Sequence, residues 1–384
     1  MIPLLRQSLR PFFLGAALWA PLALVLWLAL LAGTLSLPLA FDALAWHQHE
    51  LLFGYAGGVI AGFLLTAAPN WTEQPPVRGL PLFGLAALWA AARGLNLFGA
   101  AVGPWFAAAV EVGFWMVLGA LVLCQILAGR SWRNLPVVAL VACLGLGCAL
   151  SHAGAAGLTT GEFGRRLGFG AVFLLIGLIG GRVVPSFTRN WLSRRSGERL
   201  PAAPTGWLDH AAMAALVAGI LGWMSAPAFW LSGILLLAAG IGLLAQLARW
   251  RVVATASEPL VLILHLGYGW LGAGLAVLGL GILWPGAISP LATMHALTAG
   301  AVGTMTLAMM TRATLGHTGR ALTADVATVW IYGLAQVGAL FRVLAPALPI
   351  DHGVAMAMAA LLWGGAFVVF SVHYGPMLVR AGPG

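Results

Sequence analysis

Apolar residues fill long runs of this chain, and short polar stretches separate the runs. A run of about 20 apolar residues is the length that an α-helix needs to cross a bilayer, and prolines and glycines stand between the runs, where helices end. The pattern predicts helices at residues 12–36, 46–68, 79–98, 102–128, 135–153, 163–184, 207–225, 227–249, 259–283, 289–312, 324–345 and 353–378. We therefore expect an all-α, polytopic membrane protein of twelve transmembrane helices.

The composition agrees with this pattern. The 384 residues are 61% hydrophobic and 8% charged, and the mean hydropathy is +0.97, whereas about a quarter of the residues of a soluble domain are charged. The first apolar run follows Arg6 and Arg10 and is too long for the core of a signal peptide. We interpret this run as the first spanning helix.

The arginines predict the orientation of the chain. All 19 basic residues are arginine, and with the N-terminus inside, fifteen of them fall in inner loops or at inner helix ends. Arg165 and Arg166 fall outside, while Arg93 and Arg342 lie within helices. The positive-inside rule then places both termini in the cytoplasm. The net charge of +9 follows from this topology and does not indicate a nucleic-acid partner.

A polar stretch, Thr188 to Pro204, divides the predicted helices into six and six. We expect a single integral membrane domain with helices 1–6 in residues 1–187, a cytoplasmic loop at 188–206 and helices 7–12 in residues 207–384.

A weak internal similarity suggests a further grouping. The predicted helices 46–68 and 163–184 each contain an FG pair, at Phe53 and Phe169, and are followed by an NW pair, and 289–312 contains GAVGTMTLAMMTR from Gly300. These helices are four apart in the order, which suggests three groups of four.

Polar residues at the head of helix 46–68 are the strongest sign of chemistry. The segment WHQHE contains His47, His49 and Glu50, and ionisable groups inside a membrane usually mark functional sites. Histidine ligates haem iron and copper. Residues two apart on a helix point about 200° apart, so the two histidines should have different partners, and Glu50 could orient a histidine nitrogen. A helix start that merely tolerates polar groups at the interface is the alternative.

Two more histidines lie within predicted helices. His295 enters helix 289–312 from the outer side, at a depth similar to that of His47 and His49, so it is a candidate to complete an outer haem site. His265 lies in LHLGYGW, three residues before Tyr268 and on the same helix face. A hydrogen-bonded structural histidine is the alternative for each.

His317 follows helix 289–312 between Arg312 and Arg320. Guanidinium groups suit haem propionates, but the positive-inside rule would place arginines there as well. His295 and His317 are 22 residues apart, about 33 Å along a helix, and cannot share a metal.

The remaining chemical candidates are weaker. We interpret His152, His210, His352 and His373 as structural, the three cysteines as small core residues without a CxxC pair, and Glu111 as a weak candidate for a proton path. The sequence has no phosphate-binding loop, GxGxxG fingerprint, nucleophile triad or HExxH motif.

Several motifs together resemble the NnrS family: RPFF at Arg10, WHxHE-x2-FG at Trp46, GFLLTA-x-PNWT at Gly62, LHxGYxW at Leu264 and HALT-x-GAxGTMxLAMMTRxxLGHTGR at His295. The resemblance extends over nearly the whole chain. It implies a membrane protein associated with haem b and copper, in the bacterial inner membrane, that belongs to the response to nitric oxide and is often encoded beside denitrification genes. Carried over by position, it puts His47, His49, His265, His295 and His317 first as metal or haem ligands.

A weaker similarity is to the haem–copper oxidases and nitric oxide reductases, which also have twelve helices in three groups of four. This chain departs from them because helix 163–184 has no histidine and no His-His pair exists. The copper site of those enzymes is therefore missing as such.

We expect a haem protein that binds or reduces nitric oxide under nitrosative stress. Arg312 and Arg320 would bind the cofactor, Glu50 and Tyr268 would relay protons, and an unidentified donor would supply electrons. The alternatives are a twelve-helix transporter that exports a small metabolite or metal complex, and a haem sensor or metal-binding protein without turnover.

Overall fold

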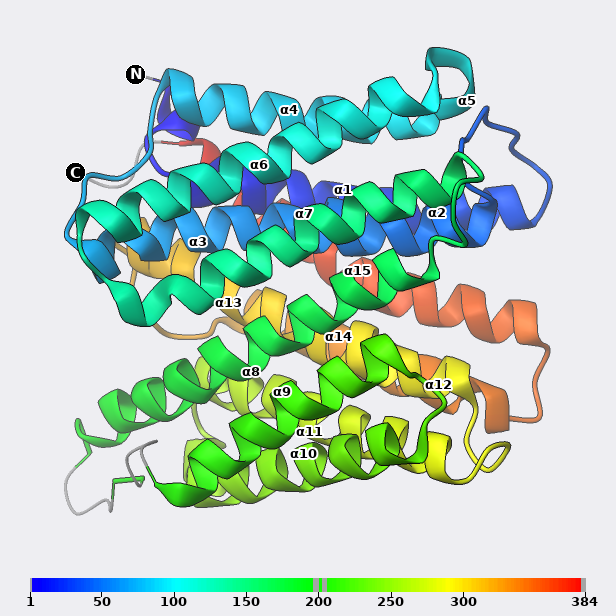
Figure 1. Ribbon diagram of the computed structural model, residues 1–384. Coiled ribbons are helices and arrows are strands. Elements are labelled where there is room, and N and C mark those ends of the chain that lie inside the picture. Colours follow the sequence, from blue (N-terminus) through cyan, green and yellow to red (C-terminus); the bar gives the residue numbers. More distant parts are fainter. Residues whose placement is uncertain (1, 196–199, 202–205, 381–384) are drawn as a thin grey trace. The chain divides into compact units, whose positions relative to one another are not determined.

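The computed structural model describes residues 2–195, 200–201 and 206–380, and within them the chain forms helices and turns but no strand (Figure 1). Residues 196–199 and 202–205 of the predicted cytoplasmic loop lie outside the described residues. Twelve of the described helical segments are long and apolar enough to cross a membrane: Leu9–Leu31, Ala43–Thr72, Leu80–Leu97, Pro104–Ala128, Trp132–Ala155, Glu162–Leu192, Trp207–Ser225, Trp230–Arg249, Pro259–Leu283, Pro290–His317, Val326–Ala347 and His352–Val379. The prediction of an all-helical chain with twelve spans is confirmed.

Two of the spans are built in the same unusual way. In the second span, α2 (Ala43–His49) is followed by a π-helical segment, η2 (Glu50–Ala56), and then by α3 (Gly57–Thr72). In the tenth span, α12 (Pro290–His295) is followed by the π-helical η5 (Ala296–Val302) and by α13 (Gly303–His317). Short π-helical segments inside α-helices often occur at functional sites. Here each one directly follows a histidine.

Side-chain caps fix the starts of these two spans. Asp42 accepts hydrogen bonds from the backbone nitrogens of Leu44 and Ala45, at 3.0 and 2.9 Å, at the start of α2. Ser289 accepts one from Ala292 at 3.4 Å at the start of α12, where Pro290 occupies the first turn. A capped first turn satisfies backbone N–H groups that have no partner within the helix.

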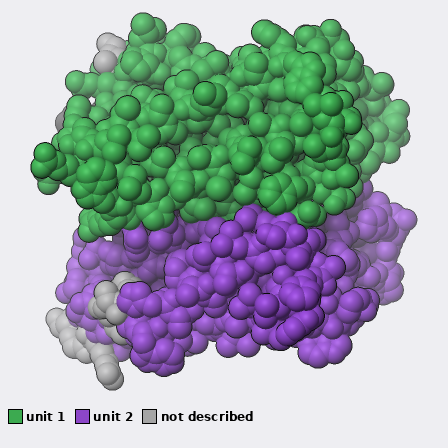
Figure 2. Space-filling view, in the orientation of Figure 1, with its two compact units in different colours: residues 1–171, 313–321, 367–384 green, residues 172–312, 322–366 purple. Residues whose placement is uncertain are grey.

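The chain divides into two compact units, coloured separately in Figure 2. Unit 1 consists of residues 1–171, 313–321 and 367–384, and unit 2 of residues 172–312 and 322–366. Unit 1 contains α1 (Leu9–Leu31), α2, η2, α3, α4 (Leu80–Leu97), α5 (Gly99–Val102), α6 (Pro104–Ala128) and α7 (Leu135–Ala155). Unit 2 contains α9 (Trp207–Ser225), α10 (Trp230–Arg249), α11 (Pro259–Leu283), α12, η5 and α14 (Val326–Leu344). The helices α8 (Glu162–Leu192), α13 and α15 (His352–Val379) contribute residues to both units.

In unit 1, glycines of the second span allow two tryptophans to pack against its backbone. A Cβ atom on Gly58 would lie 3.1 Å from the Trp89 indole, and one on Gly57 would lie 2.9 Å from the Trp115 indole. The Trp89 indole N–H also donates a 2.9 Å hydrogen bond to the carbonyl of Gly54 within the π-helical segment. These contacts bring α4 and α6 against the part of the second span that follows His49.

Candidate metal centre

Four buried side chains in unit 1 bring metal-ligating atoms together. His49, Glu111, Cys148 and His152 are all buried, and one ligand atom from each lies within 4.8 Å of all the others. They come from three spans, because His49 ends α2, Glu111 lies on α6 and the other two lie on α7. Cys148 and His152 are four residues apart, which puts them on one face of α7.

The carboxylate of Glu111 is the centre of this cluster. Its Oε2 atom lies 2.7 Å from Nε2 of His49 and 2.9 Å from Nε2 of His152. Because an ionised carboxylate only accepts hydrogen bonds, both imidazoles donate to it. The amide of Asn96 donates to the same oxygen at 2.9 Å.

A second group of side chains supports the first. The guanidinium of Arg93 donates to Oε1 of Glu111 and, at 2.6 Å, to Oε2 of Glu50. Glu50 also accepts hydrogen bonds from the Trp19 indole at 2.9 Å and from Asn96 at 2.8 Å. Arg93, Glu50 and Glu111 are all buried, so this is a fully desolvated ion-pair network whose charges must compensate each other.

The charges of the network leave room for a cation. With neutral imidazoles and a neutral thiol, the two carboxylates and one guanidinium add to a formal charge of −1. In addition, Nδ1 of His49 and Nδ1 of His152 are buried and have no hydrogen-bond partner in the described part of the chain. Buried polar atoms are usually satisfied, and a cation bound in the cluster would compensate the net charge of the network.

The donor set restricts the kind of ion. Two imidazoles, a thiol and a carboxylate suit copper or zinc, whereas magnesium and calcium prefer oxygen ligands alone. Bonds of about 2.0–2.3 Å to one ion place tetrahedral ligand atoms about 3.3–3.7 Å apart. The observed separations are all within 4.8 Å, and two of them, from Glu111 to His49 and to His152, are hydrogen bonds of 2.7 and 2.9 Å. A single ion would therefore fit after these two hydrogen bonds are replaced by bonds to the ion.

The structure gives the two histidines of WHQHE different partners, as their spacing predicts. The His49 ring lies in the cluster, and the His47 ring stacks on Trp27 with centroids 3.9 Å apart and planes inclined by 17°. The carboxylate that bonds a histidine is that of Glu111, while Glu50 bonds Arg93, Asn96 and Trp19.

The other predicted haem ligands inside helices lie in unit 2. Nδ1 of His295 donates a 2.7 Å hydrogen bond to the carbonyl of Leu291, and no described residue bonds its Nε2. Nδ1 of His265 lies 3.1 Å from the carbonyl of Val261, and its Nε2 lies 3.3 Å from the hydroxyl of Thr188. The predicted relay Tyr268 donates a 2.8 Å hydrogen bond to Gln246. Of the two histidines, only His295 has a ring nitrogen without a hydrogen bond to a described residue, and this nitrogen is available as a ligand.

The residues around the end of the tenth span are divided between the units. His317 and Arg320 belong to unit 1, where Gln7 donates a 3.0 Å hydrogen bond to the backbone carbonyl of His317. Arg312 belongs to unit 2, and its guanidinium lies over the Phe187 ring at 4.0 Å from the centroid. Their predicted role in binding haem propionates stays a prediction.

The sequence indicated His49 and Glu50 as part of a site. It gave Glu111 only as a weak candidate for a proton path, and Cys148 and His152 as structural residues. The strongest available signal was the spacing of Cys148 and His152, because a C-x3-H pair puts two ligands on one helix face. Glu111 stands out in the sequence only as an acid in an apolar run. Arg93 and Asn96 are three residues apart on the third span, so their spacing indicates that they share one helix face.

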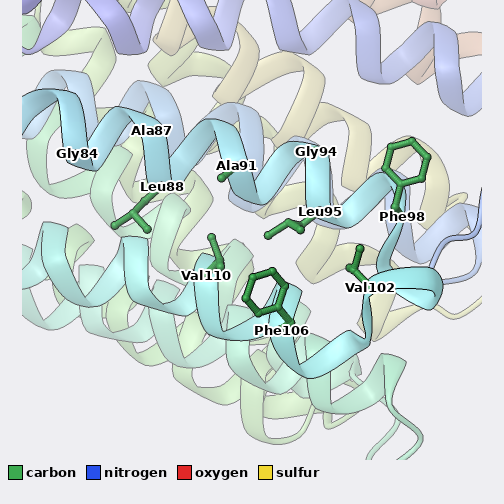
Figure 3. Close-up of a pocket in the computed structure, with 10 residues that line it drawn as sticks. All are labelled: Gly84, Ala87, Leu88, Ala91, Gly94, Leu95, Phe98, Val102, Phe106 and Val110. Atoms are coloured by element: carbon green, nitrogen blue, oxygen red, sulfur yellow. The ribbon is translucent and has the colours of Figure 1, made fainter.

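An apolar groove of 740 Å³ lies beside α4 and α6, also in unit 1 (Figure 3). Small residues of α4 line it together with larger side chains such as Leu88, Phe98 and Phe106. No lining residue carries a metal-ligating group. The α4 helix therefore has two faces, one with Arg93 and Asn96 in the metal centre and one on the groove.

The fold and the cluster define a polytopic membrane protein with a buried candidate centre for a transition metal. The family described as NnrS protein matches residues 3–381, and the chain belongs to the NnrS family. The resemblance found in the sequence motifs is thus confirmed over nearly the whole chain. No curated protein matches the chain.

Proposed function

We propose that this protein is a haem- and metal-containing membrane protein of the response to nitric oxide, and that the buried cluster in unit 1 holds its metal ion. The observation that carries the proposal is the convergence of His49, Glu111, Cys148 and His152 within 4.8 Å. Membership of the NnrS family supports the nitric oxide part of the proposal.

Copper is the ion that we propose for the cluster. The imidazole and thiol ligands suit it, and the formal charge of −1 is neutralised by a monovalent copper ion with a neutral thiol, or by a divalent one with a thiolate. Zinc has the same ligand preferences, so metal analysis of the purified protein separates the two.

The protein side chains would prepare the site in three ways. Glu111 holds the two imidazoles through a shared oxygen, Arg93 and Asn96 hold Glu111, and the burial of all four ligands excludes water. A redox-active metal held there by these four ligands would bind nitric oxide at an additional coordination position. Pre-organised ligands lower the cost of binding the ion and define its geometry.

Haem b is proposed at the histidines outside the cluster, with His295 first. Its Nδ1–H is fixed by the carbonyl of Leu291, which leaves the Nε2 lone pair for a metal, the arrangement usual for a ligating histidine. His47, His265 and His317 remain further candidates, and His49 is assigned to the metal cluster. We also propose Glu50 and Tyr268 as proton relays, a still unidentified electron donor, and the bacterial inner membrane with both termini in the cytoplasm.

Metal analysis of variants tests the cluster. The protein would be purified in detergent from cells supplied with copper, zinc and haem, and its metals measured by mass spectrometry. We expect about one metal ion per chain in the wild type and a loss of at least about 90% in the His49→Ala/His152→Ala double variant, because removing two of four ligands leaves no chelating site. The double variant His210→Ala/His352→Ala, at two exposed positions, is the matched control.

Equal metal content in all three proteins would overturn the metal assignment. Spectra and nitric oxide electrodes test the rest of the proposal. Absence of haem bands after full haem supply would exclude the haem part, and a protein that neither binds nor consumes nitric oxide when reduced would exclude the nitric oxide part.

A further inference from the structure

Unit 2 contains an arrangement of helix, histidine and arginine similar to that around the metal centre of unit 1, but without acids in the positions of Glu50 and Glu111. In both units a short helix ends on a histidine, His49 or His295, and continues as a seven-residue π-helical segment. In both units the next spanning helix carries a buried arginine near its end, Arg93 on α4 and Arg342 on α14.

The two arginines differ in their partners. Arg93 is paired with two carboxylates, whereas none of the ion pairs among the described residues includes Arg342. Only 8% of Arg342 is exposed, and its NH1 atom is buried without a hydrogen-bond partner. Asp351, the acid in the connection that follows α14, accepts instead a 3.0 Å hydrogen bond from the backbone of Val354 at the start of α15.

The side chain of Arg342 points into the helix bundle and not toward lipid. It continues the buried face of α14, which is formed by Thr328, Ile331, Tyr332, Ala335, Gly338 and Ala339. One turn before it, a Cβ on Gly338 would lie 2.6 Å from the backbone nitrogen of Trp363. The helix is therefore held tightly on the same face that carries the guanidinium.

The α12 helix, which ends on His295, packs against α14, which carries Arg342, and against η6 (Ala345–Ala347), which begins three residues after Arg342. Nδ1 of His295 donates a hydrogen bond to the carbonyl of Leu291. The other ring nitrogen, Nε2, is therefore the acceptor, and no described residue forms a hydrogen bond with it. Both side chains thus have unused ligand-binding atoms in one region of unit 2.

We propose that Arg342 and His295 form a binding site for an anionic group, a carboxylate or a small oxyanion, carried by a ligand. A guanidinium with a buried, unbonded NH1 atom and no ion-pair partner among the described residues is unfavourable in an apolar bundle, and its planar donors match the two oxygens of a carboxylate. In unit 1 the protein supplies this charge itself through Glu50 and Glu111. In unit 2 the ligand supplies it.

The same chemistry has two sources. The anion can be a small free species, or it can be a carboxylate of a prosthetic group such as haem, with the iron bound elsewhere or at His295. Anion binding by Arg342 and His295 requires neither the metal cluster of unit 1 nor any other bound metal.

Titration with ¹³C-formate tests the site, with binding followed by broadening of the formate NMR signal. Full-length protein would be prepared from haem-supplied and from haem-deficient cells, as wild type, Arg342→Gln and Arg249→Gln. Arg249 is the matched control, because it lies in unit 2, its side chain is 34% exposed, and its guanidinium is already paired with Asp209.

We expect formate to bind the haem-deficient wild type and the control, and to bind Arg342→Gln at least about tenfold more weakly, since a charge-assisted pair is lost. Equal binding by haem-supplied wild type identifies a free anion as the occupant, and blocked binding identifies a prosthetic carboxylate. The melting temperature gives a second readout, because formate should raise that of the wild type and not that of Arg342→Gln.

Two results would overturn the proposal: formate binding by Arg342→Gln as strong as that of the wild type, or no binding by the wild type in either preparation. Metal content of the same samples is measured in parallel. A normal metal content without formate binding would reject the anion site alone. Formate binding without bound metal would reject only the metal assignment.

Discussion

His49 and His152 donate hydrogen bonds to one and the same atom, Oε2 of Glu111, at 2.7 and 2.9 Å. Their rings meet edge to face with centroids 4.9 Å apart. A single carboxylate oxygen therefore aligns two imidazoles from two different spans, and both rings keep a buried Nδ1 without a partner. Such a carboxylate–histidine arrangement is typical of groups that orient metal ligands.

Removal of the charge of Glu111 should weaken metal binding. In Glu111→Gln the amide keeps the size of the side chain, but its NH2 group faces donors of Arg93, His49 and His152. We expect an affinity about 10–100-fold lower, measured by competition with a chelator. Glu162→Gln, at an exposed acid paired with Arg166, should change the affinity by less than about twofold, and the same small effect in Glu111→Gln would show that Glu111 has no part in the site.

The thiol of Cys148 should be distinguishable from the other cysteines. Cys148 is buried in the cluster, and Cys124 is exposed. We expect Cys148→Ala to remove any thiolate-to-metal absorption band of the copper-loaded protein and to lower its affinity at least about tenfold, because one of four ligands is lost. Cys124→Ala should leave both unchanged. A band that persists in Cys148→Ala would exclude the thiol as a ligand.

The sequence predicted the number and kind of the helices because apolar length alone decides whether a helix can span a bilayer. It did not predict the π-helical segments after His49 and His295, since these depend on packing against Trp89 and Trp363, whose indoles bond carbonyls within them. The positions of the termini and the groups of four remain predictions.

The sequence indicated one of the four cluster residues, His49, and there is a physical reason why it did not indicate the others. WHQHE is visible because its polar residues are adjacent in sequence, whereas Glu111 and His152 reach His49 only through the packing of three spans. A spanning helix is apolar on all sides, so its sequence does not show which face is inside. Neither Glu111 nor the Cys148 and His152 pair therefore gave a signal that it meets His49.

Arg93 should stabilise the fold through both carboxylates. Arg93→Gln leaves Glu50 and Glu111 buried together with a formal charge of −2, and breaking a buried pair costs about 3–5 kcal/mol. In Glu50→Gln/Arg93→Gln the formal charge returns to −1, as in the wild type, and we expect at least half of the lost stability to return. Thermal unfolding in detergent, followed by tryptophan fluorescence, measures both. Additive losses in the double variant would contradict a charge-coupled network.

The absence of a side chain at Gly54 should be necessary for the network to form. A Cβ there would lie 2.9 Å from Oε2 of Glu50 and 3.1 Å from the Trp19 indole nitrogen, and it would also meet the Arg93 guanidinium. We expect Gly54→Ala to cost about 1–3 kcal/mol by overpacking and to lower the metal content. Gly113→Ala is the matched control, because nothing apart from its chain neighbours and the adjacent backbone of α6 lies within 4 Å of its Cβ position, and it should be neutral or stabilising by up to about 1 kcal/mol. Melting temperature and metal analysis of the two variants test this, and an unchanged metal content in Gly54→Ala would show that the ion does not depend on the alignment of Glu50 and Arg93.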